Sequence, residues 1–194
     1  MDNRFCRVFK FSAGQCRKKS FFSHCICESN FPGGGGYMES KRDRETFISL
    51  YEKIYGDLYR FAFYTLKNRQ DAEDAVQDTV VDAYGSFGKL RSLESFRGWI
   101  FKILSNKCRR RLKEYLIKPM ELPSDLKTEE DMTEKIQVRE AFWALSDEER
   151  LIVSMHVFAG YTGKEIARIL HKKEGTIRSK ESRALKKMAQ MLEE

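Results

Sequence analysis

The spacing of apolar residues is the feature that most constrains how this chain can fold. Apolar side chains recur every three or four positions along Phe47, Tyr51, Ile54, Leu58 and Phe61, which places them on one face of a helix. No segment sustains the alternation of β-branched and polar residues that a half-buried strand requires. With 3 prolines in 194 residues, little interrupts the helical patterns. We therefore predict an all-α fold.

The helical patterns fall into two groups that are separated by a polar segment. Residues 38–115 carry three amphipathic patterns, and residues 134–194 carry four shorter ones. Between them, residues 116–133 contain Pro119 and Pro123 and are rich in acidic side chains. We therefore predict two small helical domains, joined by a flexible acidic linker that is long enough that the domains need not touch.

The second group of helices has the pattern of a helix-turn-helix. Residues 146–149 (Ser-Asp-Glu-Glu) and 162–165 (Thr-Gly-Lys-Glu) each place a hydroxyl residue three positions before a glutamate, a capping box that starts a helix. The second box opens a short apolar pattern, a turn follows at residues 171–174, and a basic helix is expected from Thr176. In this arrangement the first turns of the last helix enter the major groove of DNA.

Charge is concentrated in blocks. Residues 97–118 hold eight Lys or Arg and one acid, and residues 160–187 hold nine Lys or Arg and three acids. Residues 71–82, by contrast, hold five acids and no base. Like charges at helical spacing repel each other, so the acidic block favours a basic protein partner, and the basic blocks favour two nucleic-acid surfaces. The alternative interpretation is that these are solvated helix faces of ordinary charge.

The first 37 residues differ from the rest of the chain. They hold four of the five cysteines, lack apolar periodicity, and show a cysteine spacing that fits no common zinc pattern. Four glycines at residues 33–36 stand shortly before Met38, as expected where a purine-rich ribosome-binding site is translated in frame. We interpret residues 1–37 as a translated leader before a natural start at Met38; the alternative is a genuine extension with a glycine hinge. Under both interpretations we expect no fold there.

Enzymatic and membrane functions find no support in the sequence. None of the three histidines (His24, His156 and His171) has a Cys, a Ser or paired carboxylates at a spacing that suggests catalysis, and no glycine loop is followed by a phosphate-binding lysine. No apolar run reaches membrane-spanning length, and basic residues interrupt the N-terminal segment where a signal peptide would be apolar. We therefore expect a cytoplasmic protein that is not an enzyme and carries no cofactor, metal or membrane segment.

Four motifs, taken together, resemble one family. Residues 71–84 (DAEDAVQDTVVDAY) are similar to the segment of the sigma-70 family that docks on the clamp helices of RNA polymerase. Residues 95–106 (SFRGWIFKILSN) resemble the segment that melts promoter DNA and captures an unstacked base of the −10 element. Residues 161–170 and 175–184 resemble the helix-turn-helix that reads the −35 element. The resemblance covers roughly residues 43–192 and is to the small, extracytoplasmic-function sigma factors, which lack the extra domains of housekeeping members.

The resemblance implies three sets of binding residues. The set that faces the polymerase clamp is Asp71, Glu73, Asp74, Gln77, Asp78 and Asp82. At the −10 element, the set that holds the extruded base is Lys89, Leu90, Arg91, Ser92 and Asn106, and the set that follows the phosphates is Lys107, Arg109, Arg110 and Arg111. The set at the −35 element is Lys173, Thr176, Arg178, Ser179, Ser182 and Arg183.

The resemblance also implies partners and a function. The partners are core RNA polymerase, through its clamp and flap regions, promoter DNA, and an anti-sigma factor that can hold the protein inactive near the membrane. The function is promoter recognition, promoter melting and transcription initiation at a stress- or signal-responsive regulon. The alternative is a helix-turn-helix regulator that works without docking on polymerase, which leaves residues 71–84 and 96–106 unexplained.

Two residues depart from the family pattern on the last helix. Glu181 stands where many relatives carry an apolar residue, and Leu185 stands where many carry Arg or Lys. Glu181 has two interpretations: it accepts a hydrogen bond from a cytosine amino group, or it is a surface acid that pairs with Lys180 or Arg178.

Overall fold

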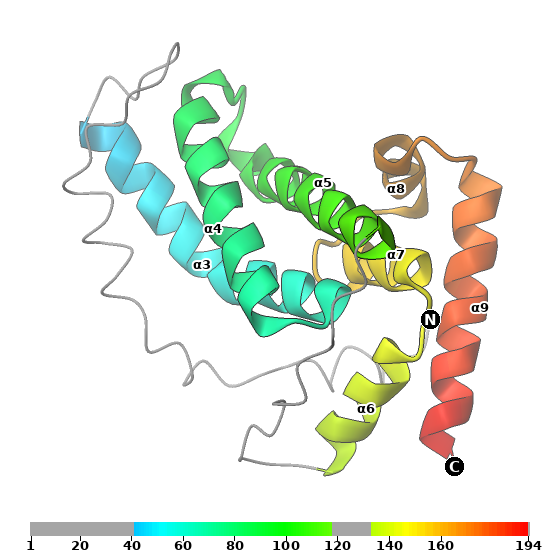
Figure 1. The fold of residues 1–194 in the computed structure, drawn as a ribbon. Coiled ribbons are helices and arrows are strands. Elements are labelled where there is room, and N and C mark those ends of the chain that lie inside the picture. The colour runs from blue at the N-terminus through cyan, green and yellow to red at the C-terminus, as the bar shows by residue number, and fades with distance from the viewer. Residues whose placement is uncertain (1–40, 118–132, 194) are drawn as a thin grey trace.

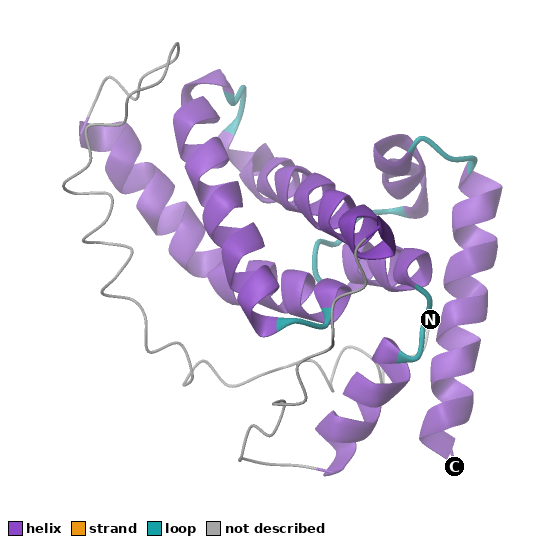
Figure 2. Cartoon of the chain, in the orientation of Figure 1, coloured by secondary structure: helices purple, strands orange, loops and turns teal. Residues whose placement is uncertain are grey.

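The computed structural model describes residues 41–117 and 133–193, and within these ranges every element is a helix (Figure 1, Figure 2). The elements are α3 (Lys41–Leu66), α4 (Arg69–Ser86), the 3₁₀ turns η1 (Phe87–Lys89) and η2 (Leu93–Ser95), α5 (Phe96–Ile117), α6 (Thr133–Trp143), α7 (Asp147–Val157), α8 (Gly163–Leu170) and α9 (Glu174–Glu193). The prediction of an all-α fold is confirmed. The predicted leader, residues 1–37, lies outside the described residues, as does the predicted linker apart from the helix ends that reach into it.

Helices α3, α4 and α5 form a bundle around an aromatic core. Phe47 of α3 meets the rings of Tyr84, Phe87 and Phe96 edge-on, at centroid distances of 5.3, 5.3 and 5.6 Å. Such edge-to-face pairs add roughly 0.5–1.5 kcal/mol each to the burial of the rings. The predicted apolar stripe of α3 therefore faces inward, and the short turns η1 and η2 are tied to the bundle through Phe87 and Phe96.

Helices α7 and α8 start where the capping boxes predicted. Ser146 caps α7 and Thr162 caps α8, and in each box the glutamate three positions later bonds back to the capping residue. Helix α9 starts at Glu174, two residues before the predicted start, so the turn of the helix-turn-helix is shorter than expected. Burial of Ile177 on the inner side of α9 fixes its orientation against the rest of the domain.

The two helical groups pack against each other and share one buried apolar cluster. Tyr64 near the end of α3 stacks on Phe158 with ring centroids 5.4 Å apart and meets Phe142 edge-on at 5.3 Å. Phe63 lies 5.5 Å from the ring of Trp143. Helix α7 lies between the first bundle and α9 (Figure 1). The sequence predicted only that the groups need not touch; in this structure they do.

A buried arginine joins the two groups. Arg150 of α7 is 3% exposed and donates to the carbonyl of Thr65 in α3 at 3.3 Å and to the carbonyl of Leu145 at 2.7 Å. It also pairs with Asp147 one turn earlier in α7. Burial lowers the pKa of Arg150, and the charge of Asp147 opposes this effect. Because its donors are paired, the guanidinium is tolerated in the core.

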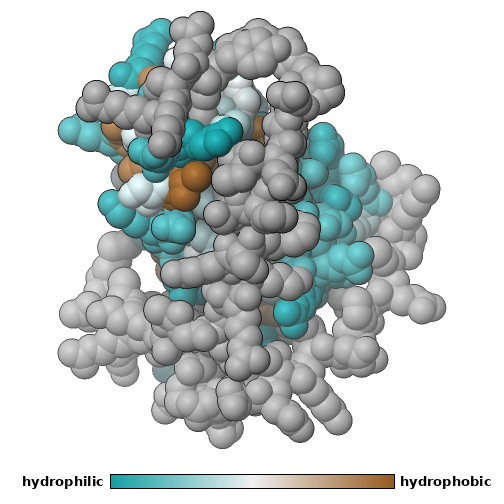
Figure 3. Space-filling view, turned by 90° about the vertical axis from the view of Figure 1, so that its left-hand side faces the viewer, coloured by the Kyte–Doolittle hydropathy of each residue, from teal (hydrophilic) through white to brown (hydrophobic). Residues whose placement is uncertain are grey.

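The described surface is mostly polar. On the side seen in Figure 3, the visible described residues are largely hydrophilic, with a small hydrophobic group at the upper left. Among the described residues, the large apolar side chains that remain exposed are Val81, Leu93 and Met191. No described helix is both long and apolar enough to cross a membrane.

Candidate nucleic-acid interface

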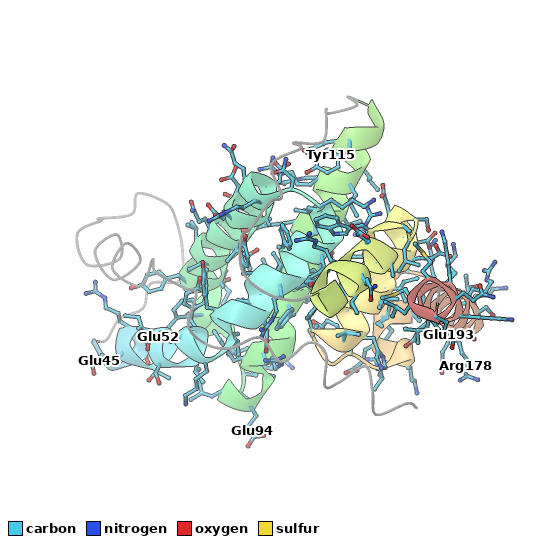
Figure 4. All side chains as sticks on the ribbon, turned by 90° about the horizontal axis from the view of Figure 1, so that it is seen from below. Glu45, Glu52, Glu94, Tyr115, Arg178 and Glu193 are labelled. Atoms are coloured by element: carbon cyan, nitrogen blue, oxygen red, sulfur yellow. The ribbon has the colours of Figure 1, made fainter. Side chains whose placement is uncertain are left out.

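The outer face of α9 and the turn that precedes it present the residues that the sequence assigned to the −35 element. All of these residues are exposed: Lys173, Thr176, Arg178, Ser179, Ser182 and Arg183. Arg178 pairs with Glu174 at 3.2 Å, and the two side chains are 79% and 47% exposed. Such an exposed ion pair is weak, so a DNA phosphate can readily replace Glu174 as the partner of Arg178. Figure 4 shows α9 nearly end-on, with Arg178 on its outer side, away from α3, α4 and α5. The face is cationic and accessible.

A carboxylate on α7 positions the turn and the start of α9. Glu148 accepts hydrogen bonds from Lys180 at 2.7 Å and from Lys172. Burial alone raises the pKa of Glu148, but the hydrogen bonds from the two lysines outweigh it, and the net shift is downward. Glu148 therefore stays ionised and ties the helix-turn-helix together, a role that its place inside a capping sequence did not suggest.

Glu181 has a partner that neither interpretation of the sequence proposed. Its Oε1 lies 3.3 Å from Nδ1 of His156 on α7, and its side chain is 16% exposed. Nδ1 of His156 forms no hydrogen bond with any described residue. Its contact with Glu181 is therefore an ion pair only when the imidazole is protonated. Lys180 pairs with Glu148 and Arg178 with Glu174, so the expected pairing of Glu181 with either cation is wrong. Glu181 points toward α7.

The basic face of α5 is divided between exposed and internally paired side chains. Asn106 and Arg110 are exposed. Lys107 instead forms an ion pair with Asp82 of α4 at 2.7 Å, with its side chain 14% exposed. Arg111 pairs with Asp71 of α4 at 3.1 Å. These two cations hold α5 against α4 in the structure.

The remaining −10 residues lie in two places. Lys89, Arg91 and Ser92 are exposed in the loop between α4 and α5, and Leu90 beside them is half-buried. Asn106 is ten residues beyond Phe96, the first residue of α5, or about 15 Å along the helix. The loop and Asn106 therefore belong to one continuous segment, with the loop before the start of α5 and Asn106 in the middle of that helix. Arg109 lies beside Asn106, donates to its Oδ1 at 3.4 Å, and also reaches the carbonyl of Ile169 in α8 at 3.5 Å.

Two further cations belong to the exposed face of α5. Lys102 and Lys113 are exposed and stand at helical spacing to Asn106 and Arg110. The sequence shows this spacing, but Lys102 lies within the resembling segment without an assigned role and Lys113 lies beyond it, so neither was among the predicted binding residues.

The acidic face of α4 is also divided. Asp71 is buried, where it accepts from Arg111 and from the hydroxyl of Tyr115 at 2.5 Å. Asp82 is tied to Lys107, and Glu73 pairs with Arg69 one turn away. Asp74 and Asp78 form no ion pair within the described residues, and Gln77 between them is exposed. The accessible acidic surface is therefore smaller than the sequence suggested.

No group of three metal-ligating side chains occurs in the described part of the chain.

The fold and the exposed cationic helix define a helical DNA-binding protein of the helix-turn-helix class.

Comparison with known proteins narrows this class to a family. The family model for sigma-70 region 2 matches residues 50–115, and the model for sigma-70 region 4 matches residues 135–188. The ECF RNA polymerase sigma factor SigM of Mycobacterium tuberculosis is 30% identical over 154 residues, covering 77% of this chain and 79% of SigM. The RNA polymerase sigma factor SigV of Bacillus subtilis is 29% identical over 136 residues, covering 68% of this chain and 82% of SigV. The chain belongs to the extracytoplasmic-function sigma factors of the sigma-70 family.

Solved structures share the fold. The sigma factor RpoE from Bartonella quintana, in complex with the anti-sigma factor NepR, matches with a TM-score of 0.60 at 22% identity, over 79% of this chain and 98% of RpoE. CnrH, in complex with the cytosolic domain of CnrY, matches with a TM-score of 0.54 at 21% identity, over 77% of this chain and 89% of CnrH. We refer below to α3–α5 as region 2 and to α6–α9 as region 4.

Proposed function

We propose that this sigma factor docks on core RNA polymerase through α4 and presents one DNA surface on α5 and another on α9. Region 2 then engages and opens the −10 element, and region 4 reads the −35 element, so that transcription starts at a stress- or signal-responsive set of promoters. The observation that carries this proposal is the separation of charge: an acidic surface on α4 stands apart from the cationic surface on α9.

The polymerase surface is best assigned to the part of α4 that forms no ion pair with any described residue. Asp74, Gln77 and Asp78 lie one turn or less apart, and the two carboxylates are not neutralised by any described residue. Asp71 is better explained as a residue that fixes α5, because its carboxylate is already buried against Arg111. Glu73 and Asp82 contribute at the edge of the surface, where exchange of an internal pair for a polymerase cation costs little.

The two DNA surfaces differ in character. On α9, Arg178 and Arg183 can reach base edges in a duplex, since the first turns of such a helix enter the major groove. On α5, Asn106 has amide groups suited to an unpaired base, and Lys102, Arg110 and Lys113 form a row that can follow phosphates. This division supports duplex recognition by region 4 and single-strand capture by region 2.

The partners and location follow from the same assignment. RpoE was captured with the anti-sigma factor NepR, and CnrH with the cytosolic domain of CnrY, and we propose an anti-sigma factor as a partner for this chain. We propose that it acts in the cytoplasm without enzymatic activity, cofactor or metal, held near the membrane when its anti-sigma factor is membrane-bound. A helix-turn-helix regulator that does not bind polymerase is disfavoured, because it would not explain the match of residues 50–115 to sigma-70 region 2.

The test is charge reversal on α4. Replacing Asp74→Lys and Asp78→Lys together should weaken binding to core polymerase at least about 100-fold, because like charges across an interface cost several kcal/mol. The matched control reverses Glu52→Lys in α3 and Glu94→Lys in η2, two exposed acids outside α4, with the same change in net charge (Figure 4). Equal loss of binding in both double variants, or none in the first, would refute the assignment.

A further inference from the structure

An acid stands in the apolar stripe that α9 turns inward. The apolar members of this stripe are Ile177, Ala184 and Met188, which are at most 1% exposed. Glu181 lies four residues after Ile177 and three before Ala184, so it is on the same side of the helix, and its side chain is 16% exposed. A carboxylate that is largely removed from water is costly unless a charge or a hydrogen bond compensates it. The helices that cover this stripe therefore have to supply a partner for Glu181.

The partner is an imidazole in the last turn of α7. Nδ1 of His156 is buried, forms no hydrogen bond with any described residue, and lies 3.3 Å from Oε1 of Glu181. A neutral ring leaves the carboxylate without a compensating charge. A protonated ring attracts it at contact distance, and the C-terminal end of α7 favours the cation as well. The contact is therefore a link between α7 and α9 that depends on a proton.

Other charged side chains around α7 have partners of their own. Those on neighbouring helices are Asp57 and Lys67 of α3, Arg97 of α5, Glu165 of α8 and Lys180 of α9. Arg97 donates to the carbonyl of Phe158, two residues after His156, and its charge opposes a proton on the ring. Asp57 lies 2.9 Å from Arg97 and offsets this charge. On α7 itself the other charged residues, 147–150, lie at least six positions before His156. Glu181 is the charged group that meets the imidazole directly.

Two links hold α9 at one rotation on α7. Lys180 binds Glu148 at 2.7 Å, and the next residue, Glu181, meets His156 eight positions further along α7. Eight residues of helix span about 12 Å, so adjacent positions of α9 are attached at points two turns apart on α7. Loss of one link allows α9 to roll about its own axis. Because Arg183 stands two residues after Glu181, such a roll moves a proposed base-reading side chain in the major groove.

We propose that His156 is a positioning residue for recognition of the −35 element: its protonated ring holds Glu181, and α9 with it, in the orientation that reads DNA. The proposal rests on the proposed function of region 4. Histidine side chains change charge between about pH 5 and pH 8. Protons and DNA then favour the same orientation of α9, so each strengthens the binding of the other. Region 4 should therefore bind a −35 duplex more tightly in mild acid, with Glu181 kept away from the bases.

The test compares His156→Gln and Glu181→Gln, singly and together, with their parent, in the full chain. The parent and all variants carry His171→Asn, which removes the exposed imidazole of the turn and tolerates its left-handed backbone. The probe is a DNA duplex that the parent selects from a random-sequence library. From about pH 8 to about pH 6, the affinity of the parent should rise roughly two- to fivefold more than that of any variant. The double variant should resemble each single one, because every change removes the same link.

A second measurement needs no DNA. Thermal unfolding of the same proteins gives the coupling between His156 and Glu181, which should be present at about pH 6 and absent at about pH 8. The matched control is the same cycle with Lys180→Gln and Glu148→Gln. A lysine and a carboxylate keep their charges over this range, so the coupling of the control pair should not change with pH.

The outcomes separate this inference from the proposed function. Coupling that appears in mild acid without any difference in DNA affinity would show that the link does not position α9, and the sigma-factor assignment would stand. Coupling that is equal at the two pH values would also overturn the inference. So would a changed base preference in Glu181→Gln that His156→Gln does not share, because Glu181 would then read a base. If the parent selects no sequence from the library, the proposed reading of the −35 element fails and the inference fails with it.

Discussion

His171 occupies the turn of the helix-turn-helix with a backbone φ of 54°, in the left-handed region that favours glycine. Its N–H group and that of Lys172 both donate to the carbonyl of Ala167, which ends α8 and sends the chain toward α9. A side chain with a β-carbon raises the energy of this conformation by roughly 1–2 kcal/mol. The turn is therefore formed at the expense of some stability.

Replacing His171→Gly should increase the free energy of unfolding by about 0.5–1 kcal/mol. The left-handed strain is removed, part of the gain is lost to the greater freedom of glycine in the unfolded chain, and the exposed imidazole leaves no cavity. Thermal denaturation measures the change. Lys173→Gly is the control, since Lys173 does not have a positive φ and the substitution should destabilise instead. A loss of stability in His171→Gly would contradict the argument.

Residue-level roles were predicted well where the partner lies on the same helix and poorly where it lies on another. The exposure of Arg178 and Arg183 agrees with the positions expected from helical spacing. The burial of Asp71 against Arg111, and the approach of Glu181 to His156, join different helices. Spacing along one helix carries no information about which neighbour packs beside it.

At the scale of the elements, helix starts were predictable because their chemistry is local. The boxes at Ser146 and Thr162 need only four residues each, and α7 and α8 begin where these residues indicate. The start of α9 lacks such a signal, and the helix begins two residues early, with Glu174 in its first turn. An acid there is favourable because it faces the positive end of the helix dipole.

The capping boxes should make region 4 sensitive to acid. Hydrogen bonds from Ser146 lower the pKa of Glu149, and hydrogen bonds from Thr162 lower the pKa of Glu165, below their ordinary value of 4.5. A lowered pKa in the folded state adds stability that is present above pH 4.5 and is lost as the pH falls through the folded pKa.

The variant Glu149→Gln with Glu165→Gln isolates this effect, because glutamine can also complete a capping box. The wild type should lose stability on acidification below about pH 4.5, and the variant should lose less over the same range. Urea titrations at a series of pH values measure both. Parallel loss in the two proteins would show that other carboxylates dominate.

At the scale of the whole molecule, the order of the helices followed from the sequence, but the contact between the two predicted groups did not. The signal was in α7, where five consecutive residues from Leu151 to Met155 are buried. Five consecutive residues point to all sides of a helix, so this part of α7 is covered all round rather than on one face. The length and acidity of the intervening segment, which suggested separation, say nothing about the stability of an interface.

Arg150 allows the coupling of the two regions to be measured. Arg150→Ala leaves the carbonyls of Thr65 and Leu145 without their donor, which should lower the free energy of unfolding by about 3 kcal/mol. Because the two carbonyls belong to different regions, the unfolding transitions reported by probes in region 2 and in region 4 should shift together in a denaturant titration. The control is Arg168→Ala at an exposed position, which should change stability by less than about 0.5 kcal/mol. A shift of the unfolding transition that only the region 4 probe reports would contradict the coupling.

The position of Tyr64 also matters while the protein is being made. Its ring packs on Phe142 and Phe158, which lie 78 and 94 residues further along the chain. At synthesis rates of about 5–20 residues per second, the 41 residues from Ile117, the last of α5, to Phe158 keep the completed region 2 waiting roughly 2–8 seconds before both of these rings are translated. During this interval its aromatic face is open to other nascent chains, so slow codons between the two regions would prolong its need for a chaperone.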